Sequence, residues 1–166
     1  MTTATTAQAA PTAVDGRVIA LAHYAARALL EGVLDRHGAT FHHSVTLRVV
    51  AAAGGSIARD ALVRDVTGSL KADESVVDGV VEELTAAHLL EAEDAEEAED
   101  EAAAGTSRLR LTDAGRALYE RTTTETAGIT ARLYADIPAE DLAVAGRVLA
   151  LVTQRANAEL AAARDA

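Results

Sequence analysis

The sequence predicts a mainly α-helical protein that carries one small β-hairpin. Of its 166 residues 49% are hydrophobic, mostly Ala, Val and Leu, with one Phe, three Tyr and no Trp. Ala and Leu are strong helix formers, and small side chains let helices pack closely. Apolar residues recur at helical spacing in several segments, whereas 108–111 alternates with the period of a strand. The length suits one domain with its own hydrophobic core.

Three helices are expected in the first 70 residues. The first covers 14–36 and ends at Gly38, and the second covers about 41–53 and ends at Gly54 and Gly55. Ser56 and Ile57 could form a very short strand before a third helix over 59–70. The apolar stripe of the first helix is Val18, Ala22, Ala25, Leu29 and Val33, and the third helix should bury Ala61, Leu62, Val66 and Leu70.

A fourth helix follows the turn "KADES". Asp73 is a suitable N-cap, and Glu74 suits the positive N-terminus of a helix. This helix should end near His88. Its expected buried residues are Val77, Val80, Val81 and Leu84.

A β-hairpin is expected next, followed by two helices. "HLLEAE" and "SRLRLT" flank an acidic loop, and the second of them alternates Leu109 and Leu111 with Arg108 and Arg110. A long helix then covers about 112–137, and a last helix begins at Pro138. The stripe of the last helix is Leu142, Ala145, Leu149, Val152, Ala156 and Leu160.

A helix-turn-helix followed by a hairpin is the winged helix-turn-helix arrangement. We expect residues 41–111 to form this lobe, and we expect the helices of 14–40 and 112–166 to lie outside it. Their long apolar stripes need a partner, and a homodimer is the simplest one. Residues 1–13 have neither a basic start nor an apolar middle, so they are expected to be a disordered tail and not a signal peptide.

The composition excludes several classes of function. Without cysteine there can be no disulfide, thiolate catalysis or cysteine zinc site. No apolar run is long enough to span a bilayer, so a cytoplasmic location is the simplest one. No serine, histidine and acid are arranged for catalysis, and no glycine-rich phosphate loop is present. We therefore expect no enzyme and no cofactor.

Charge is concentrated in one region. The net charge is −11, which argues weakly against unspecific binding to nucleic acid. Residues 73–101 contain thirteen acids and no Lys or Arg. Many of these acids lie in the expected wing loop, 91–106, which should be solvated and disordered because its charges repel one another. A DNA-mimicking or protein-binding arm is the alternative interpretation.

Three segments together resemble the MarR family of transcriptional regulators. They are "LRLTDAGRALYE" at 109–120, "VVEELTAAHLLE" at 80–91 and "IPAEDLAVAGRVLALV" at 137–152. The resemblance covers roughly residues 15–162. It implies a homodimeric winged-helix regulator on a palindromic operator, with the fourth helix in the major groove and the wing against the minor groove. It also implies a small phenolic or other organic effector in a cleft beside the dimerisation helices.

The sequence departs from the family pattern on the DNA-binding side. The family commonly has Ser-Thr-x-Thr-Arg in the recognition helix, and only Ser75 of that pattern is retained in "SVVDG" at 75–79. Gly105 occupies the position of the wing arginine. His88 replaces a glycine, so we expect the end of the fourth helix to be capped differently.

Two sets of candidate site residues follow. The DNA-binding candidates are Arg59, Arg64, Lys71, Ser75, Arg108 and Arg110; the other interpretation is that the cations are solubility charges paired with Asp60, Asp65 and Asp113. The candidates for an effector pocket are His23, Tyr24, Phe41, His42, His43 and Tyr119.

The sequence thus predicts a ligand-responsive, DNA-binding transcriptional regulator. The alternative is a MarR-like protein that has lost DNA binding and binds a protein partner or a small molecule. A weaker alternative is a zinc sensor that uses His37, His42 and His43 with nearby carboxylates. Adjacent histidines of a helix point in different directions, so we predict no metal site.

Overall fold

A computed structural model describes residues 13–93 and 107–164. The chain divides into two compact units, Met1–Thr126 and Ala127–Ala166. The elements are α1 (Gly16–Arg36), α2 (Phe41–Ala52), β1 (Ser56–Ala58), α3 (Arg59–Leu70), α4 (Glu74–Ala86), β2 (Leu90–Ala92), β3 (Arg108–Leu111), α5 (Asp113–Tyr134) and α6 (Ala139–Arg164). The expected tail lies outside the described residues, as does most of the expected acidic loop.

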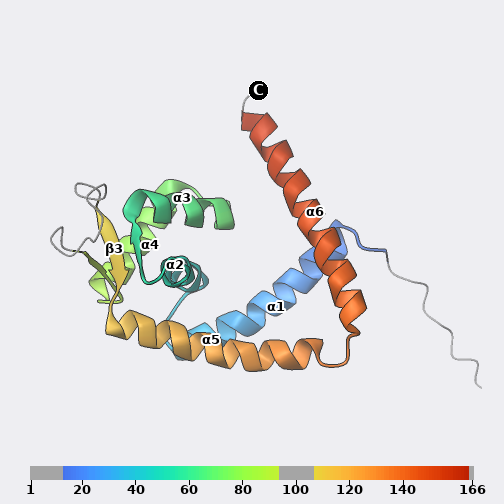
Figure 1. Ribbon diagram of the computed structural model, residues 1–166, viewed down its shortest axis with the longest axis horizontal. Helices are drawn as coiled ribbons and strands as arrows, with labels where there is room; N and C mark the ends of the chain where they lie inside the picture. The colour runs from blue at the N-terminus through green and yellow to red at the C-terminus, as the bar shows by residue number, and fades with distance from the viewer. Residues whose placement is uncertain (1–12, 94–106, 165–166) are drawn as a thin grey trace, which may run out of the picture. The chain divides into compact units, whose positions relative to one another are not determined.

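In the first unit, α2, α3 and α4 pack against one another and against a small sheet (Figure 1). The sheet has three antiparallel strands in the order β1-β3-β2. The predicted hairpin of β2 and β3 is therefore confirmed. The short strand β1 pairs with β3 and is the third strand of the sheet. A mainly helical winged helix-turn-helix lobe is confirmed.

The core of the lobe lies where the amphipathic patterns predicted it. Leu62 and Val66 of α3 are buried, while Ala61 and Leu70 are partly buried. All four predicted positions of α4 are buried, and they pack with Leu109 and Leu111 of β3 and with residues of α2. Burial of these side chains is the main stabilising contribution to the lobe.

The turn between α2 and β1 uses backbone conformations with positive φ. Gly54 and Gly55 have φ of 85° and 99°, values that glycine adopts without a steric penalty. This lets the chain reverse from α2 into β1, and the carbonyl of Gly55 accepts from the amide of Leu111.

The end of α4 corrects one expectation. His88 has a φ of 54°, and the amide of Leu89 donates to the carbonyl of Leu84 at 2.9 Å. The helix thus ends with the left-handed residue that a glycine would normally supply. The cap is of the ordinary kind, and the expectation of a different cap was wrong.

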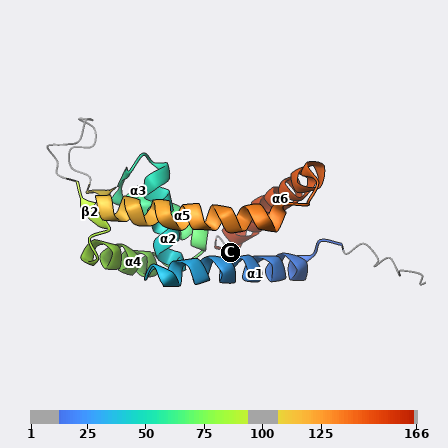
Figure 2. The same cartoon turned by 90° about the horizontal axis from the view of Figure 1, so that it is seen from below.

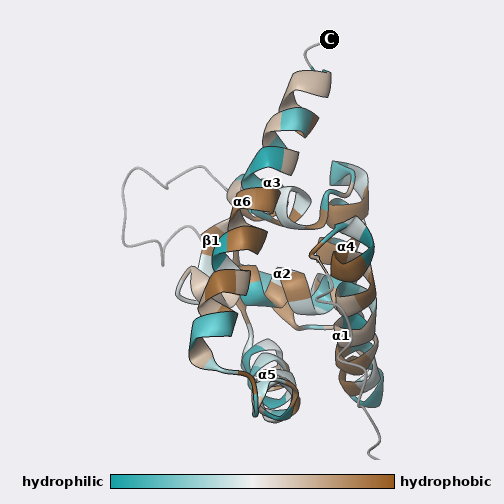
Figure 3. Cartoon of the chain, turned by 90° about the vertical axis from the view of Figure 1, so that its right-hand side faces the viewer, coloured by the Kyte–Doolittle hydropathy of each residue, from teal (hydrophilic) through white to brown (hydrophobic). Residues whose placement is uncertain are grey.

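The second unit contains α6 and the last part of α5. None of the residues of α6 is buried, and six of its large hydrophobic side chains are exposed: Val144, Val148, Leu149, Leu151, Val152 and Leu160. Brown, hydrophobic turns accordingly lie along the surface of this helix in Figure 3.

Candidate nucleic-acid interface

The fourth helix presents a short, weakly polar surface at its N-terminal end. Ser75 and Val76 are exposed in the second and third positions of α4. Val76 is 46% exposed, and over the described part of residues 41–111 it is the only large hydrophobic side chain counted as exposed. Asp73 is the N-cap residue as predicted, but its side chain makes no capping hydrogen bond; its carbonyl accepts from the amide of Val76.

The rest of this surface is acidic. Helix α4 contains four carboxylates and no basic residue: Glu74, Asp78, Glu82 and Glu83. A helix that lies in a groove of DNA needs cations, or at least neutral groups, near the phosphates. Any cation that contacts a phosphate must therefore lie on a neighbouring element.

One of these neighbouring cations, Arg59, joins α3 to α4. Arg59 begins α3, and its Nη2 lies 2.9 Å from Oδ1 of Asp78, with both side chains more than a third exposed. No N–H of Arg59 is directed at that oxygen, which has no hydrogen-bond partner among the described residues. The contact is thus electrostatic, and it offsets the negative charge of Asp78. The alternative interpretation paired the candidate cations with Asp60, Asp65 and Asp113, whereas the partner of Arg59 is Asp78.

The exposed face of the wing carries two further ion pairs. Arg110 lies opposite Glu91 in the register of β2 and β3, and Nη2 of Arg110 is 3.1 Å from Oε1 of Glu91. Nε of Arg108 donates to Oε2 of Glu93 at 2.8 Å, and its Nη2 donates to Oγ of Ser56 at 3.0 Å. The partners of both arginines are acids of the wing and not Asp113.

The two wing pairs differ in exposure. The side chains of Arg108 and Glu93 are 29% and 16% exposed, whereas those of Arg110 and Glu91 are 44% and 46% exposed. The hydroxyl of Ser56 also donates to the carboxylate of Glu93. The inner pair ties all three strands together, and the outer pair lies open to solvent.

The remaining candidates lie on α3, the turn after it and the start of α4. Arg64 is largely exposed, and its Nε is 3.5 Å from the carboxylate of Asp65, as the alternative interpretation suggested. Lys71 is exposed, has a φ of 55° and has no ion-pair partner among the residues of 13–93 and 107–164. Arg64, Lys71 and Ser75 are therefore the more accessible candidates, whereas Arg108 is engaged within the wing.

Hydrogen bonds from Ser56 and then Arg108 lower the pKa of Glu93 below its ordinary value of 4.5. A carboxylate with a lowered pKa stabilises the fold at pH above its unfolded value, and this contribution is lost as the pH falls through the folded value. Glu93→Gln should cost about 1 kcal/mol at neutral pH, and this cost should shrink below pH 4.5. Urea denaturation of both proteins at neutral and acidic pH measures the difference; a cost independent of pH would contradict the assignment.

The segment "LTDAG" at 111–115 connects the wing to α5. Oγ1 of Thr112 accepts from the amide of Gly115 at 3.0 Å and donates to the carbonyl of His88 at 2.7 Å. A Cβ on Gly115 would lie 2.0 Å from the carbonyl oxygen of Leu89. The threonine and the glycine thus fix the start of α5 against the end of α4. In Figure 2, β2 and the start of α5 lie at the same end of the first unit.

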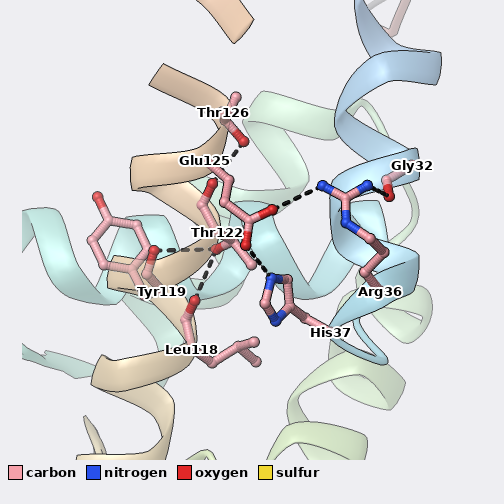
Figure 4. A network of polar contacts seen from close by, with 8 residues as sticks. All are labelled: Gly32, Arg36, His37, Leu118, Tyr119, Thr122, Glu125 and Thr126. Carbon is pink, nitrogen blue, oxygen red and sulfur yellow. Dashed lines mark hydrogen bonds and ion pairs between the residues drawn. The ribbon is translucent and has the colours of Figure 1, made fainter. Parts of the chain in front are cut away.

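A polar network joins α1 to α5 within the first unit (Figure 4). Nη2 of Arg36 donates to Oε2 of Glu125 at 2.8 Å, and Nε2 of His37 lies 2.7 Å from Oε1 of the same residue. The hydrogen bond from Arg36 contributes most, followed by the one to His37, and together they lower the pKa of Glu125. The sequence gave no sign of this network, because its members are almost ninety residues apart.

The expected effector residues are distributed over two environments. Phe41 and Tyr119 pack against the core, and the guanidinium of Arg27 lies 4.4 Å from the ring centre of Phe41. By contrast, Tyr24 is 65% exposed, and its ring centre is 5.8 Å from that of His23. The ring of His42 is 6.2 Å from that of Phe41.

Two of the histidines considered for zinc contact different carboxylates. Nε2 of His43 lies 2.9 Å from Oε2 of Glu83 on α4, while His37 contacts Glu125 on α5. Throughout residues 13–93 and 107–164, no three His, Cys, Asp or Glu side chains come close enough to hold a metal ion. Over the same ranges, no helix has the length and apolarity needed to cross a membrane.

Comparison with known proteins gives matches among solved structures. No protein-family model matches the sequence, and no curated protein does. NadR in complex with 4-hydroxyphenylacetate is 17% identical, with 88% of this chain and 96% of that chain covered and a TM-score of 0.65. A mutant MarR from E. coli, complexed with operator DNA, is 18% identical, with coverages of 82% and 91% and a TM-score of 0.64.

A MarR-family transcriptional regulator from Rhodococcus is also similar. It is 16% identical, with 83% of this chain and 91% of that chain covered, and has a TM-score of 0.65. At these identities the similarity is one of fold, and it extends over most of each chain. The chain therefore has the winged helix-turn-helix fold of MarR-family transcriptional regulators.

Proposed function

We propose that the protein is a cytoplasmic, ligand-responsive transcriptional regulator that binds a palindromic operator as a homodimer. The observation that carries this proposal is the exposed N-terminal turn of α4, set in a helix-turn-helix lobe beside a wing. One solved structure with this fold contains operator DNA, and another contains a small phenolic acid.

The two apolar helices at the ends of the chain support the homodimer. Helix α6 buries none of its residues within one chain. On α1, Leu21, Tyr24 and Leu29 are exposed. Exposed apolar side chains along each of these helices favour a protein partner, and a second copy of the same chain supplies complementary surfaces by two-fold symmetry. Such symmetry would present two α4 helices to two half-sites of a palindrome.

The chemistry of α4 indicates how the base pairs would be read. The methyl groups of Val76 suit contact with the C5-methyl of thymine, and the hydroxyl of Ser75 suits a phosphate or a base edge. Asp78 is neutralised by Arg59, which removes part of the repulsion. Arg64, Lys71 and Arg110 would supply the phosphate contacts that position the lobe.

An organic effector is the proposed ligand. The aromatic and histidine side chains of α1 and α2 suit a ligand that has an aromatic ring. Arg27 lies over Phe41 and donates to Glu31 at 2.8 Å, and it would exchange this carboxylate for an acidic group of the ligand. The rings provide apolar contact, and the guanidinium provides a positive charge for an acidic group.

A salt-dependent titration tests the proposal. A fluorescent duplex from the region upstream of the protein's own gene should bind at low salt. The logarithm of the association constant should fall linearly with the logarithm of salt concentration, with a slope of about −0.9 for each phosphate contact. Absence of binding at micromolar protein and low salt would contradict the DNA-binding half of the proposal.

A second candidate function is a dimer that has lost DNA binding and binds a protein or a small molecule. The acidic surface of α4 and the carboxylate partners of Arg59, Arg108 and Arg110 favour it. A stable dimer that binds no duplex in the same titration would select this function.

A further inference from the structure

We propose that the wing contains its own competitor for DNA: Glu91 is paired with Arg110, so a phosphate that binds this arginine must compete with the carboxylate. The inference rests on the proposed DNA-binding function and deepens it. It assigns to Glu91 the role of lowering the affinity of the wing for DNA.

The register of the sheet puts the competitor in place. Glu91 and Arg110 are directly paired residues of β2 and β3, with Nη2 and Oε1 3.1 Å apart. Directly opposed residues of antiparallel strands have their side chains on the same face. The carboxylate therefore stays beside the guanidinium even when the ion pair opens.

The exposure of the pair makes the exchange possible. The side chains of Arg110 and Glu91 are each almost half exposed, and exposed ion pairs contribute little net stability, so opening this one costs little. The neighbouring pair is different, because Arg108 and Glu93 are more buried and share hydrogen bonds with Ser56. Arg110 is thus the wing cation that DNA could recruit, and Glu91 is the group that opposes it.

The opposition has two parts. Arginine binds carboxylate and phosphate through the same N–H donors, and Glu91 already lies against one of the nitrogens, Nη2, so the two anions compete for this guanidinium. After displacement, the carboxylate remains close to the incoming phosphate and repels it, most strongly at low salt. Removal of the charge of Glu91 should therefore strengthen binding to any duplex.

The test compares two variants that change the net charge equally. Glu91→Gln removes the competitor, and Glu120→Gln removes an exposed carboxylate of α5 that has no ion-pair partner among the described residues. The probe is a mixed-sequence duplex, because phosphate contacts do not depend on sequence, and anisotropy is measured over a range of salt. We expect E91Q to bind about tenfold more tightly than the wild type, with a steeper salt slope, and E120Q to remain within about twofold.

A double-mutant cycle identifies Arg110 as the cation involved. Arg110→Ala should weaken the binding of E91Q more than it weakens the binding of the wild type. A wild type that binds DNA while E91Q gains no more than E120Q would overturn the inference and leave the proposed function intact. Failure of the wild type and E91Q alike to bind duplex would overturn both.

Discussion

Gly115→Ala is expected to lower the free energy of unfolding by about 3 kcal/mol, even though alanine is the better helix former. The new Cβ would lie 2.0 Å from the carbonyl oxygen of Leu89 and 3.0 Å from its carbonyl carbon. Both are backbone atoms, so no side chain can rotate to make room. Either α5 must move away from the end of α4, or the hydrogen bonds of Thr112 must break.

Urea denaturation of the variant and the wild type measures this effect. Gly128→Ala is the matched control on the same helix, because its Cβ would meet only the flexible side chain of Arg132 at 3.8 Å. That variant should be slightly more stable than the wild type, by up to about 1 kcal/mol. Equal stabilities for the two variants would show that α5 does not start as tightly against Leu89 as described.

Leu149→Glu is expected to convert the proposed dimer into a monomer and to weaken DNA binding by about two orders of magnitude. Leu149 is 42% exposed on a helix with no buried residue. In a dimer, a charge at such a position would be buried without a partner, which is among the most destabilising changes an interface can undergo. A monomer would hold only one half-site, so the advantage of two linked contacts would be lost.

Gln154→Glu provides the control, since it adds the same charge to the same helix at a polar position. Light scattering should give the mass of two chains for the wild type and Q154E, and a mass near 17.1 kDa for L149E. A dimeric L149E, or a monomeric wild type, would contradict the assignment of α6 to the dimer interface.

Amphipathic periodicity made much of the lobe predictable. Helix α3 was predicted over 59–70, which are its bounds in the structure. All four apolar positions of α4 are buried as predicted, because a helix with one apolar stripe has only one way to face a core. The hairpin followed from the alternation of Arg108–Leu111, which places two leucines inward and two arginines outward.

The partners of charged residues were less predictable. Whether Arg110 faces Glu91 depends on the register of two strands that are separated by a long loop, and sequence spacing does not fix that register. The pairing of Arg59 with Asp78 depends on how α3 packs on α4. The alternative interpretation therefore named local partners such as Asp60, and the non-local partners were missed.

The structural role of Gly115 was not predicted, and the effect of His88 at the end of α4 was predicted wrongly. Gly115 was recognised as part of a motif, but the reason for it is the close approach of Leu89, which comes from another element. His88 was expected to force a different helix end, whereas the surrounding hydrogen bonds hold this histidine in a left-handed conformation. Tertiary contacts decided both cases.

The ion pairs of the wing explain how acidic residues can lie beside a candidate DNA-binding helix. The two acids of the expected wing loop that lie within the described residues, Glu91 and Glu93, pair with the arginines of β3. One pair fixes the sheet, and the other is open to exchange with a phosphate. Glu91 thus adjusts the affinity of the wing for DNA, whereas Glu93 stabilises the sheet.

Sedimentation equilibrium of the protein with a fluorescent duplex from its own upstream region, at low salt, measures whether two chains assemble and bind DNA together. We expect two chains of 17.1 kDa in the free protein and two chains on each bound duplex. A free single chain, or a duplex that sediments alone at micromolar protein, would contradict this expectation.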